Sequence, residues 1–201
     1  MLNLRKGFSV TFADKLNEGY KSDGKSITAN VSAEKTLPLL EQFIKLHEDE
    51  KLFFVLELPT PETAEPKDEN GNITAFHKDI YYLDDCSPAM IRDVLDIVGE
   101  ILLDDGISQF GVGSHITNDE MMICKYNIVN LYRNDEQSRL YDGFFENIGI
   151  DKTDNLVTAW NMITSETPGE CTMCEKDGRT VYDIPSVFAE LGMYMAERRE
   201  V

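Results

Sequence analysis

The sequence lacks long apolar runs, is poor in positive charge and contains only four cysteines. Its longest apolar stretches, such as 52–56 and 101–103, are far shorter than the roughly 18 residues of a membrane-spanning helix. Basic residues occur near the start, but no apolar segment follows them, which predicts a protein without a signal peptide, located in the cytoplasm. Four cysteines in 201 residues are too few for a disulfide scaffold.

Acidic residues outnumber basic ones, with 37 Asp and Glu against 19 Lys and Arg and a net charge of −18. The middle of the chain, residues 51–150, carries 19 acidic and 7 basic residues. This balance argues against nucleic acid and anionic membranes as partners, because both need positive charge on the protein. Solubility alone is one explanation of the acidity. The other is a negative field that attracts a basic protein.

The apolar pattern predicts an α+β fold with a mainly antiparallel sheet and helices packed on one face, forming a single pair of layers. The expected strands are 8–12, 27–31, 52–58, one within 73–83 that ends in 80–83, 107–117 and 121–132. The expected helices are 33–48, 88–104, 136–148, 155–163 and 184–199. We treat 1–201 as a single α+β domain, with a C-terminal helical subdomain over 152–201 as the alternative.

Local signals refine several of these elements. Ser87 is a natural N-cap for the helix over 88–104, and Gly106 is placed for a left-handed C-cap. Pro38 is tolerated only in a first helical turn, so the helix over 33–48 is expected to begin near Thr36. Trp160 either packs among the C-terminal helices or, if exposed, anchors a partner.

Cys171 and Cys174 form the one motif-like cluster. A Cys-x-x-Cys spacing lets two thiolates bind one tetrahedral zinc ion from a tight turn, but a structural site needs four ligands and no second such motif exists. A redox dithiol and two ordinary loop cysteines are the alternatives. No other cofactor is expected.

His115 could act as a base oriented by Asp119 or Glu120, but the sequence supplies no evident nucleophile for it. The glycines of segment 110–115 lack the lysine and third glycine of a phosphate loop. We therefore interpret the protein as non-enzymatic. A zinc-stabilised protein or a hydrolase that uses the Cys171/Cys174 turn remains the alternative.

Three acidic pairs lie beside turns in the acidic middle of the chain, and we predict that they form a partner-binding face. The pairs are Asp84 with Asp85, Asp104 with Asp105, and Asp119 with Glu120. Solvated loop carboxylates are the simpler interpretation.

In its small size, its acidity and its α+β pattern the chain resembles bacterial immunity proteins, which neutralise polymorphic toxins. The resemblance extends over the whole chain without a shared motif, so no residue role is carried over. It implies a toxin domain as the partner, such as a basic nuclease masked by the acidic residues. The sequence indicates no oligomeric state.

Overall fold

One eight-stranded antiparallel sheet dominates the computed structural model, which describes residues 1–134 and 140–201. The strands follow the order β10-β5-β4-β6-β7-β8-β3-β2 across the sheet. In chain order they are β2 (Gly19–Ser22), β3 (Ser26–Asn30), β4 (Leu52–Pro59), β5 (His77–Cys86), β6 (Gln109–Ser114), β7 (Glu120–Ile123), β8 (Ile128–Tyr132) and β10 (Tyr194–Glu200). The predicted α+β class is confirmed.

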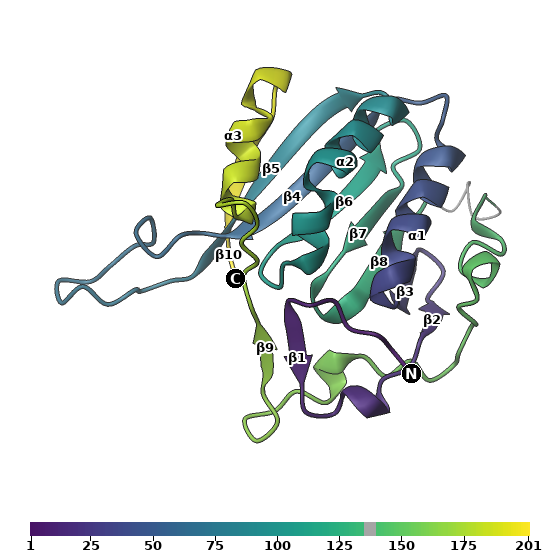
Figure 1. Ribbon diagram of the computed structural model, residues 1–201, viewed down its shortest axis with the longest axis horizontal. Coiled ribbons are helices and arrows are strands. Elements are labelled where there is room, and N and C mark those ends of the chain that lie inside the picture. The colour runs from purple at the N-terminus through teal and green to yellow at the C-terminus, as the bar shows by residue number, and fades with distance from the viewer. Residues whose placement is uncertain (135–139) are drawn as a thin grey trace.

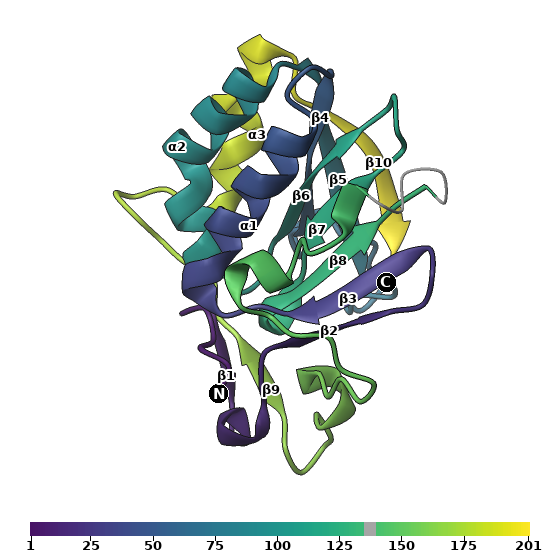
Figure 2. The ribbon, with the colours of Figure 1, turned by 90° about the vertical axis from the view of Figure 1, so that its right-hand side faces the viewer.

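Three α-helices lie on one face of this sheet (Figure 1, Figure 2). They are α1 (Ala33–Leu46), α2 (Pro88–Asp104) and α3 (Ile184–Val187). Their apolar sides pack with the inner face of the sheet into one large core that includes Phe43, Phe54 and Phe110. The strand predicted over 52–58 is β4, which pairs with β5 on one side and β6 on the other. Among the described residues, no helix is both long and apolar enough to cross a membrane.

The boundaries of α2 match the prediction, but its expected C-cap is wrong. The Ser87 side chain caps the helix by accepting a hydrogen bond from Met90 N at 3.2 Å. At the other end Asp105 is the C-cap in extended geometry, and Gly106 is not left-handed. Gly106 is needed there because a Cβ atom would overlap the Gly7 backbone and come within 2.8 Å of Thr172 N.

The prediction that the first helix begins near Thr36 is also wrong, because α1 begins at Ala33. Its first turn is held by a hydrogen bond from Ala33 N to Asn3 O at 2.9 Å. Pro38 therefore lies inside the helix, where it removes one donor.

The strand expected over 121–132 is two strands, β7 and β8, joined by a tight turn. Tyr126 and Asn127 adopt left-handed conformations in this turn, with φ of 55° and 62°. The Asn127 side chain stabilises this left-handed turn. It donates hydrogen bonds to Asn3 O and Val31 O and accepts one from Arg5 N. The prediction of one continuous strand over 121–132 is therefore wrong.

Two shorter helical predictions need correction. The helix expected over 136–148 falls partly on 135–139, outside the described residues, and the described part contains the 3-10 helix Glu146–Ile148. Gly143 has a φ of 73°, which an α-helix cannot accommodate. The segment over 155–163 contains only the 3-10 helix Ala159–Asn161. Trp160 in it is 53% exposed and meets Tyr126 edge-on, with ring centroids 4.9 Å apart.

The last predicted helix, 184–199, is wrong over its second half. After α3 and the 3-10 helix Ala189–Leu191, Gly192 turns the chain with a φ of 99°, and β10 then pairs with β5. All seven residues of β10 are exposed, as expected of an edge strand. Because β10 belongs to the main sheet, residues 152–201 are tied to the rest of the chain.

A second, two-stranded sheet lies at one end of the molecule, formed by β1 (Phe8–Val10) and β9 (Gly169–Cys171). It covers a small separate cluster of apolar side chains. Arg5 lies buried beside this cluster, where its guanidinium donates to Cys124 O at 2.9 Å and lies 4.8 Å from the centre of the Phe8 ring.

Candidate functional site

The face of the sheet opposite the helices is not covered by any α-helix in the described residues (Figure 2). Residues paired directly across strands share a face, so the register defines what this open face carries. It carries Phe53, Val55 and Glu57 of β4, Lys78, Ile80 and Tyr82 of β5, Glu120 and Met122 of β7, Tyr132 of β8, and Tyr194, Glu197 and Arg199 of β10. Phe53, Val55, Ile80 and Met122 form a small apolar cluster of their own.

Two glycines of β6 make room for this cluster. A Cβ atom at Gly113 would overlap the ring of Phe53, and one at Gly111 would overlap Met122. Both large side chains therefore lie flat over β6 instead of projecting from the sheet. The glycines in segment 110–115 thus serve close packing on the open face, not phosphate binding.

A hollow of about 400 Å³ opens on this face, next to the start of β4 and the end of β6. We call it the aromatic–acidic pocket. Its lining is Phe53, Tyr82, Asp84, Ser114, His115, Asn118, Asp119, Glu120, Tyr194 and Ala196. Three aromatic rings from β4, β5 and β10 thus meet the carboxylates of Asp84 on β5 and Glu120 at the start of β7, above the buried Asp119.

The rings of the pocket are fixed by contacts with one another. Phe53 lies 5.6 Å from Tyr82 and 4.5 Å from His115, measured between ring centroids. Tyr194 is held by a hydrogen bond of 2.7 Å from its hydroxyl to Asp84 Oδ2. His115 Nε2 lies 3.2 Å from the other oxygen of Asp84, so His115 is oriented by Asp84 rather than by the expected Asp119 or Glu120.

Among the described residues, the lining of the pocket contains neither Lys nor Arg to balance its negative charge. Glu120 is half-buried and forms no ion pair within the described residues. Burial, with a smaller contribution from the charge of Glu57, raises the pKa of Glu120. The other end of the open face is balanced, because Lys78 pairs with Glu57 at 2.7 Å and Arg199 pairs with Glu197.

A buried polar network supports the pocket from below. Asp119 is fully buried and accepts hydrogen bonds from Asn134 N at 2.9 Å and from the Tyr141 hydroxyl at 3.0 Å. That hydroxyl lies 3.0 Å from Nε2 of His47, whose Nδ1 lies 3.2 Å from Glu50. Burial, followed by the charge of Asp119, raises the pKa of Tyr141. The network therefore fixes Asp119 in one position beneath the pocket.

This network does not have the arrangement of a nucleophile and its base. The hydroxyl of Ser114 bonds to Glu50 rather than to a histidine nitrogen, and His47 is fully buried. The geometry thus supports binding better than nucleophilic catalysis.

The six predicted acidic residues do not form one face. Asp84, Asp119 and Glu120 meet in the aromatic–acidic pocket, and exposed Asp85 follows Asp84 at the end of β5. Asp104 and Asp105 lie at the C-terminal end of α2. The N-terminal end of this helix follows directly after Asp84 and Asp85 at the end of β5. Because α2 has 17 residues, its two ends, and with them the two acidic pairs, are about 25 Å apart.

Asp104 and Asp105 have structural contacts. Asp104 pairs with Lys6. Asp105 is fully buried and accepts hydrogen bonds from Ile107 N, from the backbone and hydroxyl of Ser108, and from Cys174 N, all between 2.7 and 3.0 Å. Asp105 therefore ties the end of α2 to the start of β6 and to the C-terminal segment.

The two cysteines of the predicted metal site pack in different directions. Cys171 packs against the small cluster beneath β1 and β9, and its thiol donates to the Tyr126 hydroxyl at 3.3 Å. Cys174 packs against the main core, and burial is the main cause of its raised pKa. Within residues 1–134 and 140–201, no three His, Cys, Asp or Glu side chains are grouped so that they could hold a metal ion.

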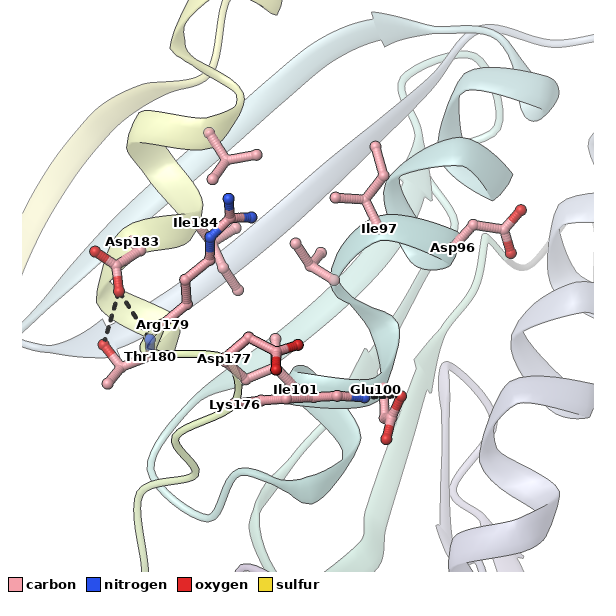
Figure 3. A pocket seen from close by; sticks show the side chains of 12 residues that line it. Asp96, Ile97, Glu100, Ile101, Lys176, Asp177, Arg179, Thr180, Asp183 and Ile184 are labelled. Carbon is pink, nitrogen blue, oxygen red and sulfur yellow. Dashed lines mark hydrogen bonds and ion pairs between the residues drawn. The ribbon is translucent and has the colours of Figure 1, made fainter.

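A second hollow, of about 430 Å³, lies on the helical side between α2 and the segment that leads into α3 (Figure 3). Ile97, Ile101 and Ile184 form apolar parts of its wall, and Lys176 pairs with Glu100 at its rim. Figure 3 shows Arg179 extending toward α3 in the same hollow. Because this lining carries charges of both signs, its chemistry does not select one class of ligand.

Comparison with known proteins does not add to this geometry. No family model, no curated protein and no solved structure matches the chain. The residues of the pocket therefore carry the evidence for a function.

No prediction from the sequence includes the aromatic half of the pocket. The apolar run over 52–58 predicts Phe53 as an ordinary core residue of a strand, and the helix predicted over 184–199 includes Tyr194. One signal was present in β5, where Ile80, Tyr82 and Asp84 alternate with inward-facing residues.

Proposed function

We propose that this protein binds a basic protein through the open face of its sheet, with the aromatic–acidic pocket at the centre of the contact. The observation that carries the proposal is the half-buried carboxylate of Glu120, which has no ion pair among residues 1–134 and 140–201, on a face that no helix of those residues covers. A half-buried charge without a counter-charge is unfavourable, and a positively charged partner would relieve it.

The composition of the face supports the same proposal. Aromatic side chains are enriched at protein interfaces, and here Tyr82, Tyr132 and Tyr194 lie around the apolar cluster. The net charge of −18 would attract a basic partner and mainly raise the rate constant of association. Masking of a basic toxin domain in the cytoplasm, as immunity proteins do, is the narrower form of this proposal.

Site-specific photo-crosslinking in the cells that produce the protein tests the proposal. A crosslinking residue replaces Tyr132, which is on the open face but outside the pocket lining, and a control replaces exposed Ile97 on α2. We expect adducts with one basic polypeptide from position 132, with a yield that falls as salt is raised. Adducts from position 97 alone would contradict the proposal.

A further inference from the structure

We propose that the aromatic–acidic pocket receives an arginine side chain of the partner. This inference rests on the proposed function and adds the chemistry of the central contact. Three features of the pocket carry it: its aromatic walls, its unbalanced carboxylates and its fixed floor.

The aromatic walls suit a flat cation. Phe53 and Tyr82 lie with ring centroids 5.6 Å apart and ring planes inclined at 54°, and Tyr194 pairs with Tyr82 across β10 and β5. The faces of aromatic rings attract a cation placed within about 6 Å. A guanidinium also stacks on such rings, which a compact ammonium group does less well.

The carboxylates supply the acceptors. Asp84 and Glu120 both line the pocket, Asp84 on β5 and Glu120 on β7. Asp84 interacts with the Tyr194 hydroxyl and with His115, and Glu120 has no ion pair in the described chain. A guanidinium presents five N–H donors, so it can donate to one carboxylate while another balances its charge.

The floor of the pocket is fixed before a ligand arrives. Asp119 is held by Asn134 N and by the Tyr141 hydroxyl, and Phe53 is seated against Gly113. A preformed site loses little conformational entropy on binding. An anion is disfavoured by the three carboxylates, and a neutral apolar group would leave Glu120 without a partner.

The experiment uses small probes on the intact, isotope-labelled protein. Nα-acetyl-arginine methylamide is titrated while backbone amide resonances are followed by NMR, with the citrulline and lysine analogues as matched probes. Citrulline keeps the shape of arginine but lacks the charge, and lysine keeps the charge but lacks the planar group. We expect saturable shifts at 82–84 and 113–120 with arginine, weaker binding of lysine and none of citrulline.

Variants assign the binding to the pocket. Glu120→Gln keeps the size of the side chain, and we expect it to weaken arginine binding by about fivefold or more. Asp84→Asn provides a second, independent loss. Asp96→Asn, an exposed change on α2, is the matched control and should leave binding unchanged. Amide resonances outside the pocket report whether each variant is folded.

Three outcomes would overturn the inference: no shifts with arginine, equal shifts with citrulline or lysine, or shifts that map to the hollow beside α2. Failure here is distinguishable from failure of the proposed function. If position 132 gives adducts but the arginine probe does not bind, the proposal of a basic partner stands and the proposal of an arginine in the pocket is wrong. Arginine binding without such adducts would retain the cation site and reject the partner.

Discussion

Phe53 and Gly113 lie directly opposite each other in β4 and β6, and the Phe53 ring occupies the space that a Cβ atom at Gly113 would need. This pairing sets the depth of the aromatic–acidic pocket, because it lets the ring lie flat along the sheet. Replacing the glycine would push the ring outward into the pocket.

We expect Gly113→Ala to lower the free energy of unfolding by about 1–3 kcal/mol, as overpacking in a well-packed region does. It should also weaken binding of the arginine probe. Urea unfolding and the NMR titration measure the two effects. Gly99→Ala in α2 is the control, because its Cβ would meet only ordinary contacts at 3.8 Å, and alanine favours the helix. An unchanged stability of Gly113→Ala would show that the ring is free to move.

Variants of Asp105 and Asp84 should differ in their effects: the first is expected to lower stability and the second to lower binding of the arginine probe. Asp105→Ala leaves several buried donors without an acceptor, so we expect a loss of about 3 kcal/mol in the free energy of unfolding. Asp84→Asn should change the free energy of unfolding little and weaken binding of the arginine probe. The same urea and NMR measurements apply to both variants. The assignment would be wrong if Asp105→Ala remained stable but lost binding.

Binding of the arginine probe should weaken as the pH falls. The pKa of Glu120 is raised, mainly by burial, so this carboxyl takes up a proton at a higher pH than an ordinary glutamate, whose pKa is about 4.3. Protonation of Glu120 removes negative charge from the pocket. Affinity measured between pH 7.5 and 5 should fall less steeply in Glu120→Gln than in the wild type. Equal slopes would remove Glu120 from the contact.

The pair of Asp79 and Arg198 should stabilise the edge of the sheet down to low pH. Burial favours the neutral carboxyl, but hydrogen bonds from Arg198 and Thr60 outweigh it and lower the pKa of Asp79. The stabilisation is complete above the unfolded pKa of about 3.9 and is lost as the pH falls through the lower folded value.

We expect Asp79→Asn to destabilise the protein by about 2 kcal/mol at pH 7. The difference from wild type should shrink below about pH 4, as measured by urea unfolding across pH. Glu197→Gln, in the exposed same-strand pair with Arg199, is the control and should change stability little. A difference that persists unchanged at the lowest pH would contradict the assignment.

The stability of the segment that carries Cys171 and Cys174 should not depend on zinc. Because their side chains pack against different clusters, we expect a metal chelator to leave the unfolding temperature unchanged. The double variant Cys171→Ser, Cys174→Ser should have a free energy of unfolding about 1 kcal/mol lower than wild type, because packing contacts of the two thiols are lost. Stoichiometric zinc in native mass spectra, together with destabilisation by chelator, would restore the metal site.

Elements with local signals could be predicted from the sequence. The boundaries of α2 follow from a capping serine, a proline at the first position and one apolar stripe. The position of β4 follows from an apolar run buried on both faces. In each case neighbours in the sequence hold the information.

The C-terminal strand could not be predicted in this way. Its apolar residues have helical spacing, but Arg198 is held by Asp79, 119 residues away. Likewise, the sequence shows that three acidic residues of the pocket lie beside turns, whereas their grouping with Phe53 and Tyr194 depends on strand order. Long-range pairing therefore decided both the strand and the site.

The strand order also divides the sheet by distance along the chain. β6, β7 and β8 pair within residues 109–132, so their contacts close only short loops. β3 pairs with β8 across roughly 100 residues, and β10 with β5 across more than 110. Closing such long loops costs conformational entropy that the strand contacts must outweigh, so we expect the middle of the sheet to form first and both flanks to assemble on it later. In that order the aromatic–acidic pocket, which needs Tyr194 of β10, would be completed only when the last flank has joined.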